Sequence, residues 1–399
     1  MPFYAAVWDS AKCCTGIVAL EKKFYWAVQK KPRGKAESGD VVSLQQSRHN
    51  VLVDIVAQDG SEWVKVSTLT EKRLLFDLAK AGWLGESSSE GSDVDDGEDD
   101  EPEGLMKQAE ALLKASKATR VRYSHPVIRI VLPKIRKGST REMDELIQQI
   151  ETLGIKVQAS EDLADVIPIS AALHRMAVDP FVRFSSTVNV DCTILLALVS
   201  DLSHSRVQTK DWHHRAILRQ IEMENENQLL PNSLWPAMGS RSLVCTSEAA
   251  RRMHEIVDLI GTRSEKQRRD CLMDVESTTH WSKEQRIRGF QELSAYVVPL
   301  DWNIPIEVVE SDLAVMQKQL PPAAEQVAKL LSPINQSVFL YGWATGITTI
   351  SSNRTVAKEI EGTIETHRLA DDDAGPDIWL CPTARSLVGK EKTRRNWDK

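Results

Sequence analysis

The sequence predicts an α/β protein with a small N-terminal α/β domain and a C-terminal domain in which helices flank a parallel sheet. Three observations support this fold class. The chain has 399 residues, which is too long for one ordinary domain. An acidic segment interrupts it at residues 86–104, and from residue 181 onward short apolar runs alternate with longer helical patterns. That alternation indicates strand–helix–strand crossovers, which build parallel sheets.

The acidic segment, GESSSEGSDVDDGEDDEPEG, is nearly free of apolar residues. It cannot bury enough surface to offset the entropy lost on ordering, so we expect a disordered linker. It also carries much of the net charge of −7, and the rest of the chain is near neutral. The predicted organisation is an N-terminal domain (1–85), the linker (86–104), a connecting helix and strand region (105–180), the C-terminal domain (181–390) and a basic tail (391–399).

The N-terminal domain contains one clear hairpin pattern. Residues 50–68, NVLVDIVAQDGSEWVKVST, alternate apolar and polar side chains around a predicted turn at Asp59 and Gly60. Residues 71–85, EKRLLFDLAKAGWLG, have helical spacing and a glycine end. Upstream, CCTGIVALEKKFYWAVQK fits one helix or two short segments.

The hairpin carries acids and a lysine that invite comparison with restriction-type nucleases. In that class the acid and the lysine are one residue apart and point into one site. Here Glu62 and Lys65 are three apart, so on a strand they face opposite sides of the sheet. We therefore interpret Asp54, Glu62 and Lys65 as structural.

The connecting region predicts alternating helices and strands. Leu105 to Lys117 has the spacing of an amphipathic helix, and RVRYSHPVIRIVLPKI reads as extended. STREMDELIQQIETLG predicts a helix capped by Ser139, and IKVQAS predicts a strand.

In the C-terminal domain three apolar runs predict strands. They are STVNV, SLVCT and SVFLYG, and each is followed by a polar or helical segment. TILLALVSDL and SEAARRMHEIVDLIG predict the helices that follow the first two strands.

Carboxylates follow two of these predicted strands. Asp191 ends the first strand, with Thr193 close behind. Glu248 follows the second, and Glu255 lies seven residues later on the same helical face. Ligands of open parallel sheets bind outside the carboxyl ends of the strands, and hard ions such as Mg²⁺ or Mn²⁺ require several oxygen ligands.

A simpler interpretation competes with the metal site. An aspartate between a strand and a helix is often an N-cap, whose carboxylate accepts hydrogen bonds from the first helical N–H groups. Glu248 and Glu255 lie in SEAARRMHE, where charges surround the helix, so both could be solvated.

Several segments resemble a known family. NVDCTILLALVSDLSH, SLVCTSEAARRMHEIVDLIG and TGITTISSNRTVAKEIEG resemble the C-terminal PIN-like domain of an uncharacterised eukaryotic family known only as a domain of unknown function. VDIVAQDGSEWVKV resembles the N-terminal region of that family. The resemblance implies a metal-dependent ribonuclease, in which acids hold Mg²⁺ or Mn²⁺ and activate water to attack an RNA phosphodiester.

The resemblance assigns roles to three acids. Asp191 takes the first acidic position of the PIN pattern, and Glu248 or Glu255 takes the second. It therefore implies that Asp191, Glu248 and Glu255 are catalytic, with Asp191 and Glu248 as metal ligands.

The chain departs from the PIN pattern at two later positions. Trp343 stands where the family places an aspartate, and an indole cannot bind Mg²⁺. Asn353 takes the last position, often acidic in active enzymes, with Thr349, Ser351 and Thr193 as possible neutral oxygen donors.

A basic strip in the connecting region could contact RNA. Lysine and arginine side chains neutralise phosphates there and an aromatic ring could stack on a base. The strip could equally be a solvated edge facing the acidic linker. Its predicted RNA contacts are Arg120, Arg122, Tyr123, Arg129, Lys134, Arg136 and Lys137.

Other motifs add little. The six cysteines have no C-x-x-C spacing and are expected as free thiols. His213 and His214 are adjacent, and no acid or cysteine completes a zinc set with them. Without a membrane-length apolar run or a secretory signal, we expect an intracellular protein, cytoplasmic or nuclear.

Two hypotheses follow. The first is a Mg²⁺- or Mn²⁺-dependent ribonuclease or RNA-processing factor with a partly degenerate acidic site. The second is a catalytically inactive RNA- or protein-binding module on a PIN-like scaffold. The sequence names neither the partner nor an oligomeric state.

Overall fold

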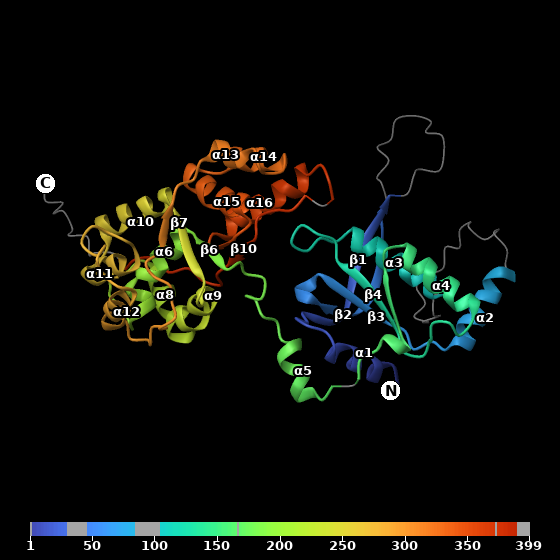
Figure 1. Ribbon diagram of the computed structural model, residues 1–399. Helices are drawn as coiled ribbons and strands as arrows, with labels where there is room; N and C mark the ends of the chain where they lie inside the picture. The colour runs from blue at the N-terminus through green and yellow to red at the C-terminus, as the bar shows by residue number, and fades with distance from the viewer. Residues whose placement is uncertain (1, 30–45, 84–103, 166, 372, 389–399) are drawn as a thin grey trace. The chain divides into compact units, whose positions relative to one another are not determined.

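The chain divides into two compact units, residues 1–179 and 180–399. The structure is a computed structural model, and it describes residues 2–29, 46–83, 104–165, 167–371 and 373–388 (Figure 1). The predicted linker, apart from Gly104, and the predicted tail at 391–399 lie outside these residues.

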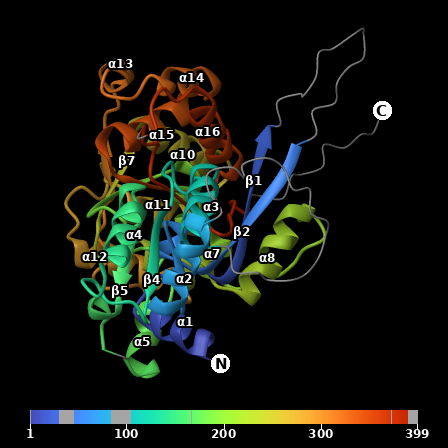
Figure 2. The same cartoon turned by 90° about the vertical axis from the view of Figure 1, so that its right-hand side faces the viewer.

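The first unit contains a mixed five-stranded sheet in the order β1-β2-β3-β4-β5. Strands β1, β2 and β3 pair antiparallel, whereas β3, β4 and β5 pair parallel. Figure 2 shows β1 and β2 side by side. The strands are β1 (Ala19–Gln29), β2 (Gln46–Ala57), β3 (Glu62–Val66), β4 (Val127–Leu132) and β5 (Lys156–Ala159).

Helices pack on both faces of this sheet. One core cluster joins α3 and α4 to the sheet around Trp63 and Ile130, and a second joins α1 to Ile55 and Val64. The helices of the first unit are α1 (Pro2–Lys12), α2 (Glu71–Trp83), α3 (Leu105–Lys117), α4 (Arg141–Thr152) and α5 (Ile169–Met176).

The hairpin and the two helices that follow it were predicted correctly, but three details were wrong. Residues 19–29 form one long strand, β1, and neither one helix nor two short segments. Helix α4 is capped by Thr140, whose side chain accepts from the N–H of Met143, and not by Ser139. The 105–180 region does not merely connect two domains, because it supplies β4 and β5 to the first sheet.

The second unit contains a five-stranded sheet in the order β10-β9-β6-β7-β8, and every strand pair in it is parallel. Strand β6 is first in this unit's sequence and central in its sheet. The strands are β6 (Thr187–Val190), β7 (Ser242–Thr246), β8 (Glu307–Val309), β9 (Thr348–Ser351) and β10 (Ile378–Leu380).

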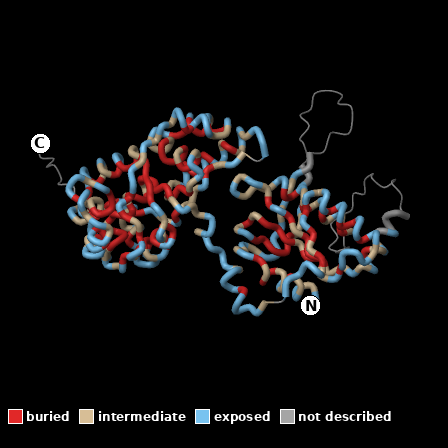
Figure 3. Tube along the Cα trace, viewed as in Figure 1, coloured by how far each residue is buried: buried red, intermediate tan, exposed pale blue. Residues whose placement is uncertain are grey.

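The helices of the second unit pack on the sheet and on one another. Helix α6 follows the central strand and is buried almost along its whole length, whereas α15 packs on β6, β7 and β9. Figure 3 shows the buried residues gathered in the interior of each unit. The helices are α6 (Cys192–Val199), α7 (Asp201–His204), α8 (Arg215–Glu226), α9 (Trp235–Met238), α10 (Ser247–Ile260), α11 (Arg263–Leu272), α12 (Lys283–Glu292), α13 (Leu313–Gln317), α14 (Ala323–Leu330), α15 (Pro333–Thr345) and α16 (Arg354–His367).

One predicted strand of this unit is a helix. SVFLYG lies within α15, and the third site strand is β9, which begins at Thr348. A short apolar run fits a buried strand and a buried helix equally well. The helix start is nevertheless signalled, because Ser332 and Pro333 occupy the positions before and at the first helical residue.

Two further expectations concern cysteine and membranes. All six cysteines are unpaired in the structure, as predicted. Among the described helices, none combines the length and the apolar character that a membrane span requires.

The contact between α15 and β9 depends on a glycine. A Cβ atom at Gly342 would lie 2.1 Å from Thr349 Oγ1, which is impossible without a shift of the helix or the strand. We expect Gly342→Ala to lower the free energy of unfolding by about 1–3 kcal/mol, measured by urea denaturation. Gly362→Ala in α16 is the matched control, because nothing lies within 4 Å of a Cβ there. The control should gain about 1 kcal/mol from helix propensity. Equal stability of the two variants would contradict this account of the packing.

Candidate functional site

The chain changes direction across the second sheet between β6 and β9. From β6 it proceeds outward through β7 to β8, and then returns to the other side of β6 as β9 and β10. Such a switch point is where open parallel sheets bind ligands, at the carboxyl ends of the strands. Asp191 directly follows β6 and Ser351 ends β9. The N–H of Asp191 donates to the carbonyl of Ile350 at 3.0 Å, so the two strand ends are adjacent.

The Asp191 carboxylate is held by two hydroxyl groups. Oδ2 accepts hydrogen bonds from Thr193 Oγ1 at 2.6 Å and from Ser351 Oγ at 2.7 Å. The residue is 3% exposed. Burial raises the pKa of Asp191 above its usual value, although the two hydroxyls and the backbone N–H groups of Cys192 and Thr193 oppose the rise. Asp191 occupies the N-cap position of α6 but makes no side-chain capping hydrogen bond, and its side chain instead ties β6 to β9.

Both hydroxyl oxygens are themselves acceptors. Thr193 Oγ1 accepts from the N–H of Ser352 at 3.2 Å, and Ser351 Oγ accepts from the N–H of Asn353 at 3.0 Å. The turn after β9 therefore closes over the carboxylate. Each hydroxyl therefore already donates one hydrogen bond and accepts another, so both are held in place by the fold.

Two of the predicted neutral donors point their side chains elsewhere. Asn353 caps α16, where its Oδ1 accepts from the N–H of Val356 at 3.3 Å. Thr349 Oγ1 accepts from Asn189 Nδ2 at 3.1 Å, and Asn189 also donates to the carbonyl of Val338 in α15. Thus Thr193 and Ser351 bond to Asp191, whereas Thr349 and Asn353 bond to other partners.

The two predicted glutamates have separate partners. Glu248 is half-buried, and its Oε2 accepts from Ser311 Oγ at 3.0 Å and from Ser247 Oγ at 3.3 Å. Glu255 is exposed and pairs with Arg252 at 3.2 Å and with Arg251. These hydrogen bonds and charges hold the pKa of Glu255 below its usual value. Neither glutamate shares a hydrogen-bond partner with Asp191.

Trp343 makes a structural contact. It is 9% exposed, and its indole Nε1 donates to the carbonyl of Ala374 at 3.0 Å. The indole therefore holds the chain that leads into β10.

These residues do not fit a divalent ion. Mg²⁺ and Mn²⁺ need several oxygen ligands, commonly from more than one carboxylate. In the part of the chain that the structure describes, no group of three or more His, Cys, Asp and Glu side chains could hold a metal ion. The side-chain partners of Asp191 are the hydroxyls of Thr193 and Ser351, which also accept backbone N–H groups of the turn after β9.

The predicted RNA strip is divided by the fold. Residues 120–123 precede β4 and residues 134–137 follow it, and six residues of strand span about 20 Å. The guanidinium of Arg129, in β4, donates hydrogen bonds to Glu62 at 3.0 and 3.2 Å and to Gln158 at 2.8 Å. Lys137 pairs with Asp162 at 2.9 Å.

The part of the strip before β4 forms a strained turn. Val121 and Ser124 exchange backbone hydrogen bonds of 2.8 and 3.1 Å, and Arg122 and Tyr123 between them have φ values of 49° and 66°. A two-residue hairpin turn with both φ values positive favours Asn-Gly, because larger side chains are strained there. Arg120 donates to the carbonyl of Tyr123 and so braces the turn.

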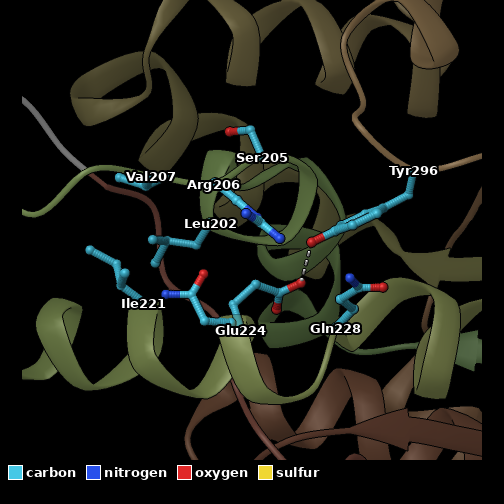
Figure 4. Close-up of a pocket in the computed structure, with 9 residues that line it drawn as sticks. Leu202, Ser205, Arg206, Val207, Ile221, Glu224, Gln228 and Tyr296 are labelled. Carbon is cyan, nitrogen blue, oxygen red and sulfur yellow. Dashed lines mark hydrogen bonds between the residues drawn. The ribbon is translucent and has the colours of Figure 1, made fainter.

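A buried acid that the sequence analysis missed lies elsewhere in the second unit. Glu224 Oε2 accepts from Arg385 Nε at 2.9 Å. Its Oε1 accepts from the hydroxyl of Tyr296 at 3.3 Å (Figure 4). Burial raises the pKa of Glu224, and the charge of Arg385 opposes the rise. The cavity beside them has a volume of about 20 Å³, room for a single water molecule, so it cannot admit a substrate. No sequence signal joins Glu224 to an arginine 161 positions away.

The first hairpin also pairs its charges. Lys65 Nζ lies 3.1 Å from Asp54 Oδ1, whereas Glu62 is bound by Arg129. Glu62 and Lys65 therefore have separate partners, as the strand geometry predicted.

The second unit is thus an α/β domain with a buried carboxylate at the carboxyl end of the central strand of a parallel sheet. Residues 188–295 match the model of a family described as a protein of unknown function, DUF1308. That match includes Asp191, Glu248 and Glu255 and ends before β9. No curated protein and no solved structure matches the chain.

The Ser351 hydroxyl should contribute strongly to the free energy of unfolding only while residue 191 is a carboxylate. We expect Ser351→Ala to lower the free energy of unfolding by about 1.5–3 kcal/mol, because a buried charged acceptor loses a donor. In an Asp191→Asn background the same substitution should cost clearly less, since the amide is neutral. A double-mutant cycle from urea denaturation at neutral pH measures the difference. Additive effects would show that the hydrogen bond does not couple the two strand ends.

Proposed function

We propose that the chain is an RNA-binding protein whose PIN-like second unit lacks metal-dependent nuclease chemistry. The absence of metal chemistry is argued from the hydrogen-bond partners of Asp191. Its Oδ2 accepts from two hydroxyls, and the two glutamates that would complete an acidic site bond elsewhere. The resemblance to PIN domains, together with a carboxylate after the central strand of a parallel sheet, supports a nuclease-type scaffold.

Loss of metal chemistry follows from the charge balance of the site. A two-metal centre needs several negative ligands to offset four positive charges. Asp191 provides one negative charge at most, and Glu248 and Glu255 bond to other partners. Trp343 supplies an indole where another acid is expected.

RNA binding is supported by the turn at residues 121–124. Strained backbone persists where the surrounding structure enforces it, and it is concentrated at functional sites. Arg122 is exposed at this turn, and the next residue, Tyr123, is half-buried. A guanidinium beside an aromatic ring is suited to a phosphate and a neighbouring base of single-stranded RNA. Lys134 and Arg136 are exposed beyond the other end of β4 and are assigned no role in this contact.

The first test separates binding from cleavage. We expect the full chain to bind single-stranded RNA in the presence of EDTA and to leave it uncut after incubation with Mn²⁺. Any change in Tm caused by Mn²⁺ should be the same for the native chain and for Asp191→Asn, because the carboxylate holds no ion. Fluorescence anisotropy, gel analysis and thermal denaturation measure these properties. Mn²⁺ stabilisation or cleavage that disappears in Asp191→Asn would instead establish the ribonuclease hypothesis.

The second test addresses the strained turn. Replacing Arg122 by Asn and Tyr123 by Gly should raise the free energy of unfolding by about 1–2 kcal/mol, because both residues suit positive φ. The same double variant should bind RNA about tenfold more weakly, a loss of roughly 1.4 kcal/mol. Gln58→Asn is the matched control, since Gln58 is exposed with φ of 49° in another turn of the same unit.

The control should change stability without changing RNA affinity. Unchanged RNA affinity in the double variant would remove the turn from the RNA surface. Binding to a folded protein partner with no RNA affinity at all would favour the protein-binding alternative.

A further inference from the structure

We propose that a cavity in the first unit binds a small organic carboxylate with an apolar body, such as a medium-chain fatty acid. The cavity has a volume of about 340 Å³. Small-molecule sites commonly measure about 300–1,000 Å³. It lies between α1 and the parallel strands β4 and β5. Neither Asp191 nor the turn at residues 121–124 lines it, so this inference does not depend on the proposed function.

The topology of the first sheet leaves this space open. Both crossover helices, α3 and α4, pack on the face of the sheet that carries Ile130 and Val157. Helix α1 packs on the opposite face, against β2, β3 and Val131 of β4. Gln158 is in register with Val131, and Arg129 lies two residues before it, so both side chains belong to the α1 face. They line the cavity where α1 no longer covers the sheet.

The carboxyl ends of three parallel strands meet at the cavity. Thr68 follows β3, Lys134 follows β4, and residues 163–164 follow β5. The N–H of Ser67 donates to the carbonyl of Val131 at 2.9 Å, so the ends of β3 and β4 are adjacent. Ligands of α/β sheets bind outside the carboxyl ends of parallel strands. The cavity therefore occupies the position in this sheet where a ligand is expected.

One face of α1 and the segments after β4 and β5 form an apolar wall. Residues three and four positions apart share a face of a helix, and the α1 residues at the cavity have this spacing. Leu163 is 36% exposed, so an alkyl chain or ring that covers it would remove apolar surface from water, which favours binding. The apolar lining residues are Pro2, Ala5, Ala6, Pro133, Leu163 and Ala164.

Three hydrogen-bond donors at the cavity have no acceptor in the described part of the chain. They are the hydroxyls of Ser10 and Thr68, which are half-buried residues, and the ammonium of Lys134, which is exposed. A carboxylate has two oxygens, and each accepts more than one hydrogen bond. A carboxylate ligand would therefore supply the missing acceptors, whereas an ammonium ligand would not.

The charges of the lining also favour an anion. Asp9 is compensated by Lys12 at 2.8 Å. Arg129 is compensated by Glu62 at 3.0 Å. Lys134 has no carboxylate partner among the described residues. The charge that the fold leaves uncompensated at this cavity is thus positive, and an ionised acceptor forms the stronger kind of hydrogen bond with it.

The first experiment compares ligands that differ in one group, on the full chain. Octanoate should bind saturably by calorimetry and raise Tm in a dose-dependent way. Octanamide keeps the alkyl chain without the charge, and acetate keeps the charge without the alkyl chain. Each should bind about tenfold or more weakly than octanoate. Equal affinity of octanoate and either of these two ligands would overturn the proposal.

Variants test the two parts of the site. Lys134→Met keeps the aliphatic stem and removes the charge, and we expect about a tenfold increase in the Kd of octanoate. Lys117→Met is its control, because Lys117 is exposed on α3, which packs on the other face of the sheet. Ala5→Phe fills the space beside α1 and should abolish binding. Ala171→Phe is the matched control, since Ala171 is exposed on α5 and does not line the cavity.

Two further results would overturn the proposal: no saturable binding of octanoate by the native chain, or an unchanged Kd in Lys134→Met. If Ala5→Phe disturbs folding, seen as a lower Tm without ligand, Lys134→Met alone decides. RNA binding at the turn of residues 121–124 is measured separately, so failure of one proposal leaves the other intact.

Discussion

The second unit depends on how one buried carboxylate is satisfied. A carboxylate removed from water must receive hydrogen bonds, and Asp191 receives them from Thr193 in α6 and from Ser351 at the end of β9. The same two hydroxyls then fix the turn after β9 by accepting the N–H groups of Ser352 and Asn353. The position of the central strand, the start of its helix and the entry into α16 are thus linked through one group. The linkage thus depends on Oδ2 of Asp191 and on the hydroxyls of Thr193 and Ser351.

Both units pair their buried charges with opposite charges from other elements. In the first unit Glu62 pairs with Arg129, and Asp54 pairs with Lys65. Asp201 with Arg268 and Glu224 with Arg385 do so in the second. A buried pair that loses one partner leaves an uncompensated charge, so these residues are constrained by folding alone. Acids and bases that suggest a catalytic site are here largely structural. Groups that the fold leaves strained, such as the Arg122–Tyr123 turn, are therefore more informative about function.

Sequence patterns predicted what depends on local chemistry. The run from Thr187 to His204 gave β6 and α6, and the placement of Asp191 between them followed directly. Proximity of Asp191 to Ser351 could be expected because parallel strands end at one edge of a sheet. The surface position of Glu255 could not be predicted in the same way. Its arginine partners, three and four residues away, offset its charge at the helix surface. Strand β1 was missed because FYWAV lies in a stretch rich in lysine and glutamate, where aromatic β-propensity competes with helical spacing. The pairing of Glu224 with Arg385 depends on tertiary packing over a long sequence separation, which no local pattern encodes.

The contact of Trp343 explains why restoring one acid would not restore a metal site. Its indole donates to Ala374, and a few residues later Asp377 binds β9 twice, through its carbonyl to the N–H of Thr349 and through its carboxylate to Thr348 Oγ1. The segment from Ala374 to Asp377 leads into β10 and so closes the outer edge of the sheet. An aspartate at position 343 would leave the Ala374 carbonyl without its donor and a cavity where the rings had been, both of which destabilise a protein. Trp343 is therefore held in place by a connected set of packing and hydrogen-bond relations, which a single change of residue would disrupt.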